Sequence, residues 1–115
     1  MQKYLDIVNK IHASPYKLTI VSSGGGTNAI SALLEVAGAS NTILESHIPY
    51  SKESMDTFLN KKPDHYCSLD TCLNMAANAY KKSKEVDSES KTKHLLGIAI
   101  TCLLYTSPSP RDSIA

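Results

Sequence analysis

The stretch that decides the fold is Leu18-Thr19-Ile20-Val21-Ser22-Ser23-Gly24-Gly25-Gly26-Thr27. An apolar, β-branched run, typical of a strand covered on both faces, breaks into three glycines and continues near Asn28 as a helical pattern. A strand that passes through glycines into a helix leaves backbone N–H groups at the helix N-terminus, where they can hold a phosphate or a carboxylate. We therefore expect an anion-binding turn over residues 22–27.

The segments that follow this turn complete one parallel βαβ unit. Apolar residues from Ala29 to Val36 predict a buried helix that ends at Gly38, and Thr42–Ile48 reads as a second strand that Pro49 terminates. Strand, helix and strand of this combined length form a right-handed crossover between parallel strands. The glycine turn then lies at the carboxyl edge of the sheet, where open parallel sheets bind ligands.

Helical spacing, caps and one further apolar run define the rest of the chain. The expected elements are a first helix from Tyr4 that ends at Ser14-Pro15, a short helix over Ser51–Leu59 with Ser51 as N-cap, a long amphipathic helix after Ser68, a charged linker over Lys84–Lys93, and a buried strand over Leu95–Ile100. The predicted fold class is α/β, with three αβα layers around a mainly parallel sheet and the C-terminal part of the domain missing.

Composition allows one domain and gives no electrostatic argument for an anionic partner. The chain has 115 residues, 42% of them hydrophobic, and a formal net charge of +1. This balance argues against nucleic acid or an anionic membrane surface as a partner. The lysines at 81, 82 and 84 read as a solvated helix end, and neither a signal peptide nor a bilayer-spanning run is evident.

The three cysteines point to a reducing compartment. Their number is odd and their spacing is irregular, which argues against a disulfide framework and against a zinc site. Cys67 and Cys72 are expected to be core residues of the long helix and its start. We expect a cytoplasmic protein without a metal or cofactor.

The end of the chain differs in character from the rest. Residues 102–112 resemble the translation of a transposase-type sequencing adapter, and a disordered natural terminus is the alternative. We therefore expect a partial domain over residues 1–101 and an adapter-derived tail over residues 102–115. A sheet that stops at Thr101 would leave an exposed strand edge and an uncovered apolar face, and would be poorly stable.

Taken in order, the segments from about Leu18 to Thr101 resemble the CinA C-terminal domain family, whose best known members are bacterial nicotinamide mononucleotide deamidases. The resemblance rests on Thr19-Ile20-Val21-Ser22-Ser23-Gly24-Gly25-Gly26, Ala37-Gly38-Ala39-Ser40, Ile48-Pro49-Tyr50-Ser51-Lys52-Glu53, Cys67-Ser68-Leu69-Asp70-Thr71 and Gly97-Ile98-Ala99-Ile100-Thr101. The sequence around the three glycines and Pro49 is closer to that of a divergent, CinA-like branch found in larger proteins.

The resemblance implies a serine nucleophile but not its base. Ser22 falls on the family's nucleophilic serine, with Ser23 as the alternative, and Val21 replaces the glutamate before it. The family lysine that activates the serine is replaced by Met55, and a thioether cannot take a proton at neutral pH. Lys52 lies one turn earlier, where either a catalytic or a solvated lysine would fit.

Two functions follow from different protein classes. The first is an amidase of nicotinamide mononucleotide, with Ser22, Tyr50 and Lys52 in catalysis and with phosphate or substrate held by Ser23, Gly24, Gly25, Gly26, Thr27 and Ser51. The second is a noncatalytic nucleotide-binding or assembly module of a larger protein. His47 is either a general base or a structural histidine. The expected partner is a small nucleotide, with no nucleic acid or membrane, and self-association into a homo-oligomer is a further expectation.

Overall fold

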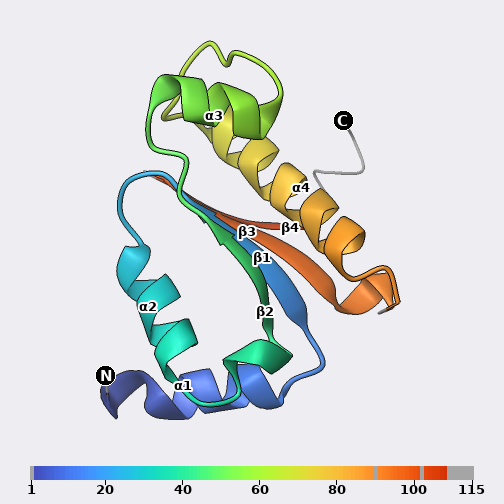
Figure 1. The fold of residues 1–115 in the computed structure, drawn as a ribbon. Helices are drawn as coiled ribbons and strands as arrows, with labels where there is room; N and C mark the ends of the chain where they lie inside the picture. The colour runs from blue at the N-terminus through green and yellow to red at the C-terminus, as the bar shows by residue number, and fades with distance from the viewer. Residues whose placement is uncertain (1, 90, 102, 109–115) are drawn as a thin grey trace.

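One four-stranded sheet organises the computed structural model, which describes residues 2–89, 91–101 and 103–108 (Figure 1). The elements in chain order are α1 (Gln2–Ala13), β1 (Lys17–Ser22), α2 (Thr27–Glu35), the 3-10 turn η1 (Ala39–Asn41), β2 (Ile43–His47), α3 (Lys52–Leu59), α4 (Leu69–Val86), the 3-10 turn η2 (Thr92–His94), β3 (Leu95–Ile100) and β4 (Leu104–Ser107). The strand order is β2-β1-β3-β4. The first three strands are mutually parallel, and β4 is antiparallel to β3.

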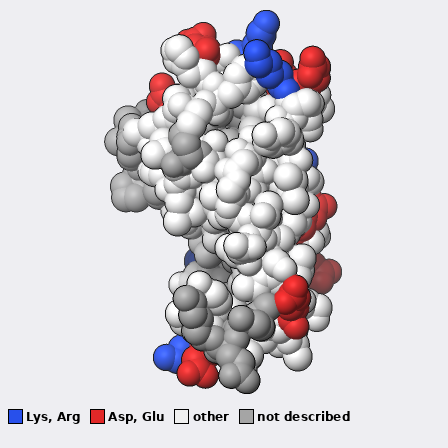
Figure 2. Space-filling view, turned by 90° about the vertical axis from the view of Figure 1, so that its left-hand side faces the viewer, with Lys and Arg blue, Asp and Glu red and all other residues white. Residues whose placement is uncertain are grey.

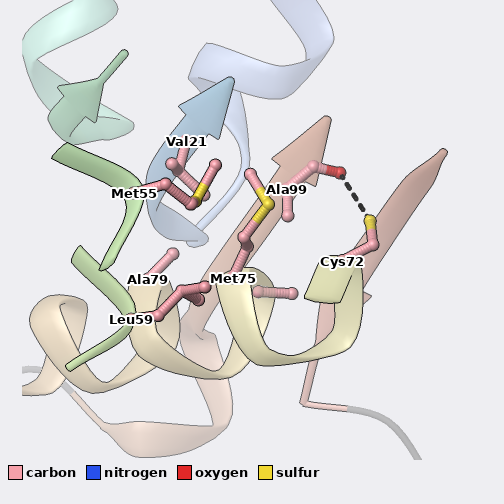
Figure 3. Packing of buried hydrophobic residues seen from close by; sticks show 8 residues of the cluster. Val21, Met55, Leu59, Cys72, Met75, Ala79 and Ala99 are labelled. Atoms are coloured by element: carbon pink, nitrogen blue, oxygen red, sulfur yellow. Dashed lines mark hydrogen bonds between the residues drawn. The ribbon is translucent and has the colours of Figure 1, made fainter. Parts of the chain in front are cut away.

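Two apolar clusters lie on opposite faces of the sheet, so the predicted α/β class is confirmed. On one face, α3 and α4 pack on β1 and β3 through Val21, Met55, Leu59, Cys72, Met75, Ala76, Ala79 and Ala99 (Figure 3). On the other face, Ile30 of α2 packs on Leu18 and Ile20, with Ile43, Leu96, Ile98 and Ile100 around them. Because β1 is covered on both sides, its residues from Leu18 to Ser22 are all buried instead of alternating between buried and exposed.

The predicted βαβ unit is present as β1, α2 and β2, and β2 carries an irregularity. Leu18 of β1 pairs with Ile43 of β2, but the next residue, Thr19, pairs with Glu45. One residue of β2 is therefore skipped in the pairing. In a regular strand Ile43 and His47 would point to the same face. Ile43 instead joins the cluster on the side of α2, whereas the ring of His47 lies 5.4 Å from that of Phe58 in α3. The bulge therefore turns the end of β2 toward α3.

The helix ends follow the local signals in most cases. Ser51 and Ser68 cap α3 and α4 as predicted, each accepting a hydrogen bond from the backbone N–H three residues on. The linker expected over residues 84–93 is wrong at its start, because α4 continues to Val86. The exposed, charged side chains there gave no apolar periodicity by which to detect the last helical turn.

The expectation of an exposed outer edge on β3 is wrong for the described chain. β4 pairs with β3 from Ile100 opposite Leu104 to Gly97 opposite Ser107, and Tyr105 packs against the cluster under α4. Two expectations about the cysteines are also wrong. Cys67 is exposed rather than in the core, and it is disulfide-bonded although the number and spacing of the cysteines argued against disulfides. Cys72 is buried, as expected, and free. The adapter origin of the tail stays a prediction.

His12, which had no predicted role, joins three segments in the interior. Its Nε2 donates to the carbonyl of Leu33 at 2.9 Å, and its Nδ1 lies 3.0 Å from the hydroxyl of Thr42. Both ring nitrogens thus have hydrogen-bond partners, and this buried residue connects α1 to α2 and to the start of β2. Within the residues described, no helix is long and apolar enough to cross a membrane.

Candidate ligand-binding site

The glycine turn occupies the position that the sequence predicts, directly after the central strand β1. Gly24, Gly25 and Gly26 have φ values of 88°, 83° and 78°, in the left-handed region that side chains with a Cβ rarely adopt. Three such residues in succession turn the chain from β1 into α2. The requirement for glycine is therefore conformational at all three positions.

The turn leaves backbone donors without acceptors. The N–H of Ser23 donates to the carbonyl of Ile100 at 2.9 Å and fastens the turn to β3. Among the described residues, no acceptor is bonded to the N–H groups of Gly24, Gly25 or Gly26. The helix that follows has Gly26 as its N-cap residue and no side-chain cap. The arrangement can donate to an anion.

The corner after β2 lies beside this turn, as neighbouring parallel strands require. A Cβ added to Gly24 would lie 3.9 Å from Cε1 of Tyr50, whose own surface is 79% exposed. Ser51 follows, but its hydroxyl accepts the N–H of Ser54 at 3.1 Å and serves the start of α3. Tyr50 is therefore the side chain of this corner that borders the glycine turn.

Ser22 is placed as a structural residue. It is 0% exposed, and its hydroxyl donates to the carbonyl of Gly25 within the turn. In the part of the chain that is described, no basic side chain is hydrogen-bonded to this hydroxyl. A serine needs such a base to become nucleophilic at neutral pH.

Neither Met55 nor Lys52 is directed at Ser22. Met55, which the resemblance aligns with the lysine of the CinA family, is 1% exposed and packs among Val21, Met75 and their neighbours (Figure 3). Lys52 is exposed at the start of α3, and its Nζ lies 5.9 Å from the ring centroid of Tyr66. The three residues expected in catalysis are therefore not joined by any described contact.

Tyr66, which the sequence reading missed, anchors the loop after α3. Its hydroxyl donates to a carboxylate oxygen of Asp56 at 2.8 Å. This hydrogen bond raises the pKa of Tyr66 above its usual value, with burial as the second cause, because both favour the protonated phenol. Lys52 and Asp56 lie four residues apart on α3, a spacing that places them on one helix face and was visible in the sequence.

The face on the side of α2 offers little charge of its own. Its middle is formed by uncharged residues, whereas lysine, aspartate and glutamate side chains gather at its upper end and along its borders (Figure 2). An anion at the glycine turn would therefore be held by backbone N–H groups rather than by side-chain cations. The described residues also contain no group of three His, Cys, Asp or Glu side chains that could hold a metal ion.

No family model, curated protein or solved structure matches this chain. The likeness of residues 18–101 to the CinA C-terminal domain family therefore stays a prediction.

Proposed function

We propose that this chain is a noncatalytic nucleotide-binding module that holds a phosphate group at the turn formed by Gly24, Gly25 and Gly26. One observation carries the proposal: three consecutive left-handed glycines follow the central parallel strand, and their N–H groups have no acceptor among the described residues. Backbone donors at the start of an uncapped helix, at the carboxyl edge of a parallel sheet, suit a phosphate.

The environment of Ser22 favours binding over hydrolysis. An amidase that uses this serine must expose the hydroxyl to the carboxamide and supply a base to accept its proton. The hydroxyl is instead buried and donates to the Gly25 carbonyl, while Met55 is part of the core. The resemblance suggests nicotinamide mononucleotide as the ligand to try first.

The proposal is tested by titrating the chain with nicotinamide mononucleotide in a calorimeter while ammonia is assayed. We expect saturable binding without ammonia release. Nicotinamide riboside, which lacks the phosphate, is the matched ligand control and should bind at least about tenfold more weakly, since it forms no charge-assisted hydrogen bonds to the turn. Ammonia release that is lost in Ser22→Ala would establish the amidase instead, and equal affinity for the two ligands would remove the phosphate from the proposal.

A further inference from the structure

A hollow lies at the β2 edge of the sheet, on the face that α3 and α4 cover. It has a volume of about 440 Å³. The residues that line it are His47 at the end of β2, Ile48 and Pro49 directly after it, Ser54, Thr57 and Phe58 of α3, and Lys82 of α4. We call it the α3–α4 groove. Its size is that of sites for small organic ligands.

Lys82 gives the α3–α4 groove a positive charge. Its Nζ lies 5.7 Å from the ring centroid of Phe58, and the residue is half-buried. It was expected to be part of a solvated helix end, yet it lies against an aromatic ring where the ammonium group is partly desolvated. No acidic residue is among the described residues that line the groove. An anionic group is therefore the favoured occupant beside Lys82.

His47 contributes a second polar side chain to the groove, and its neighbours fix the position of its ring. Its Nε2 lies 2.7 Å from a carboxylate oxygen of Glu45, which does not line the groove. Because an ionised carboxylate only accepts, Nε2 donates its hydrogen to Glu45. The ring is held in place by the bulge in β2 and by its contact with Phe58.

The two hydroxyls of α3 differ in what they can offer. Thr57 donates its hydroxyl hydrogen to the carbonyl of Glu53 at 2.9 Å, as is common within a helix. The hydroxyl of Ser54 has no partner among the described residues, so it is free to donate to a ligand. Lys82 and Ser54 are therefore the donors, and Phe58 and Pro49 supply the apolar walls.

We propose that the α3–α4 groove binds an organic phosphate monoester, with the phosphate beside Lys82 and Ser54 and the organic part against Phe58 and Pro49. A lysine ammonium is a compact point charge that suits a phosphate, and planar carboxylates are better matched by arginine. A bare ion would leave most of the volume and the apolar walls unused. This site is independent of the glycine turn, which leads into α2 rather than α3.

The test is a titration of the isotope-labelled chain with phenyl phosphate, followed by amide NMR. We expect saturable shifts at Ser54, Thr57 and Lys82. Lys82→Gln should weaken binding by about tenfold or more because it removes the charge beside the phosphate. The matched control is Lys81→Gln, at the exposed neighbouring position, which should stay within about twofold because surface charges contribute little.

Four outcomes would overturn the proposal. The first is the absence of saturable shifts, and the second is an equal loss of affinity in Lys81→Gln and Lys82→Gln. The third is a set of shifts confined to Gly24–Gly26, which would assign the phosphate to the glycine turn alone. Benzoate is run in parallel, and affinity equal to that of phenyl phosphate would replace the phosphate ester with a carboxylate and overturn the assignment.

Discussion

The ends of β1 and β2 are neighbours in the sheet, yet they offer a ligand different chemistry. After β1 the chain presents backbone N–H groups on three glycines and a serine whose hydroxyl is turned inward. After β2 it presents side chains, with His47 bonded to Glu45 and with Lys82 across the α3–α4 groove. The glycine turn is suited to holding a group without reacting with it, and the groove to recognising charge and shape together.

The largest expected effect comes from placing a lysine at residue 55, the position to which the resemblance assigns the lysine of the CinA family. Met55→Lys places an ammonium group in the core under α4, where Val21 and Met75 offer no counter-charge. We expect the free energy of unfolding to fall by about 3 kcal/mol, because a buried charge without a partner is costly. Urea denaturation measures the loss, and Met55→Leu is the control that keeps the site apolar.

Met55→Lys also tests whether a lysine at this position can make Ser22 catalytic. If Met55→Lys remains folded and releases ammonia from nicotinamide mononucleotide, the lysine position reaches Ser22 and the noncatalytic assignment is wrong. We expect no ammonia, since residue 55 lies within the apolar cluster and Ser22 is bonded to Gly25.

A smaller effect on stability is expected from substituting a glycine of the turn, a change that leaves the α3–α4 groove intact. In Gly26→Ala the new Cβ would lie 2.6 Å from Cγ2 of Ile100, and the residue would be held at a φ of 78°. Ile100 is β-branched and cannot easily rotate away. We expect a loss of about 2 kcal/mol in stability and loss of nucleotide binding, measured by denaturation and calorimetry.

The matched variant for this change is Gly25→Ala. Its new Cβ meets no atom within 4 Å, so only the left-handed φ of 83° costs energy, about 1 kcal/mol. Binding of phenyl phosphate in the groove should be the same in both variants. A parallel loss of both ligands in Gly26→Ala would show that the two regions form one site.

The glycine turn and the helix caps could be read from the sequence because their causes are local. A left-handed backbone calls for glycine, and Ser51 or Ser68 satisfies an N–H only three residues away. The α3–α4 groove could not be read in this way. It brings together residues 47–49, 54, 57, 58 and 82, and it depends on a bulge for which the sequence of β2 gives no signal.

The outer edge of the sheet shows the same limit. β4 is a short strand that is held by its pairing with β3 and by the packing of Tyr105 against the cluster under α4, and its residues lie in the segment where the composition changes. Strand pairing depends on the partner as much as on the strand itself. The expectation of an unpaired edge on β3 was wrong because residues 104–107 alone do not indicate that they pair with Gly97–Ile100.

The smallest expected effect concerns the loop after α3, where Tyr66 is hydrogen-bonded to Asp56, and it depends on pH. Tyr66→Phe removes the hydrogen bond to Asp56 and should lower the stability slightly at neutral pH. The pKa of Tyr66 is raised from its usual 10.0, so the folded state holds the phenol proton more tightly than the unfolded state. The stabilisation is therefore complete below pH 10 and is lost as the pH rises from there through the folded pKa. Denaturation at several pH values should show the two proteins converging above pH 10, and a constant difference would contradict this account.

The most direct test of the central claim is the amide NMR response of Gly24, Gly25 and Gly26 to nicotinamide mononucleotide. If their N–H groups donate to the phosphate, all three signals should shift progressively and saturate, while nicotinamide riboside leaves them nearly unchanged. Binding that leaves the three glycine signals in place, with shifts elsewhere in the chain, would contradict the assignment of the phosphate to this turn.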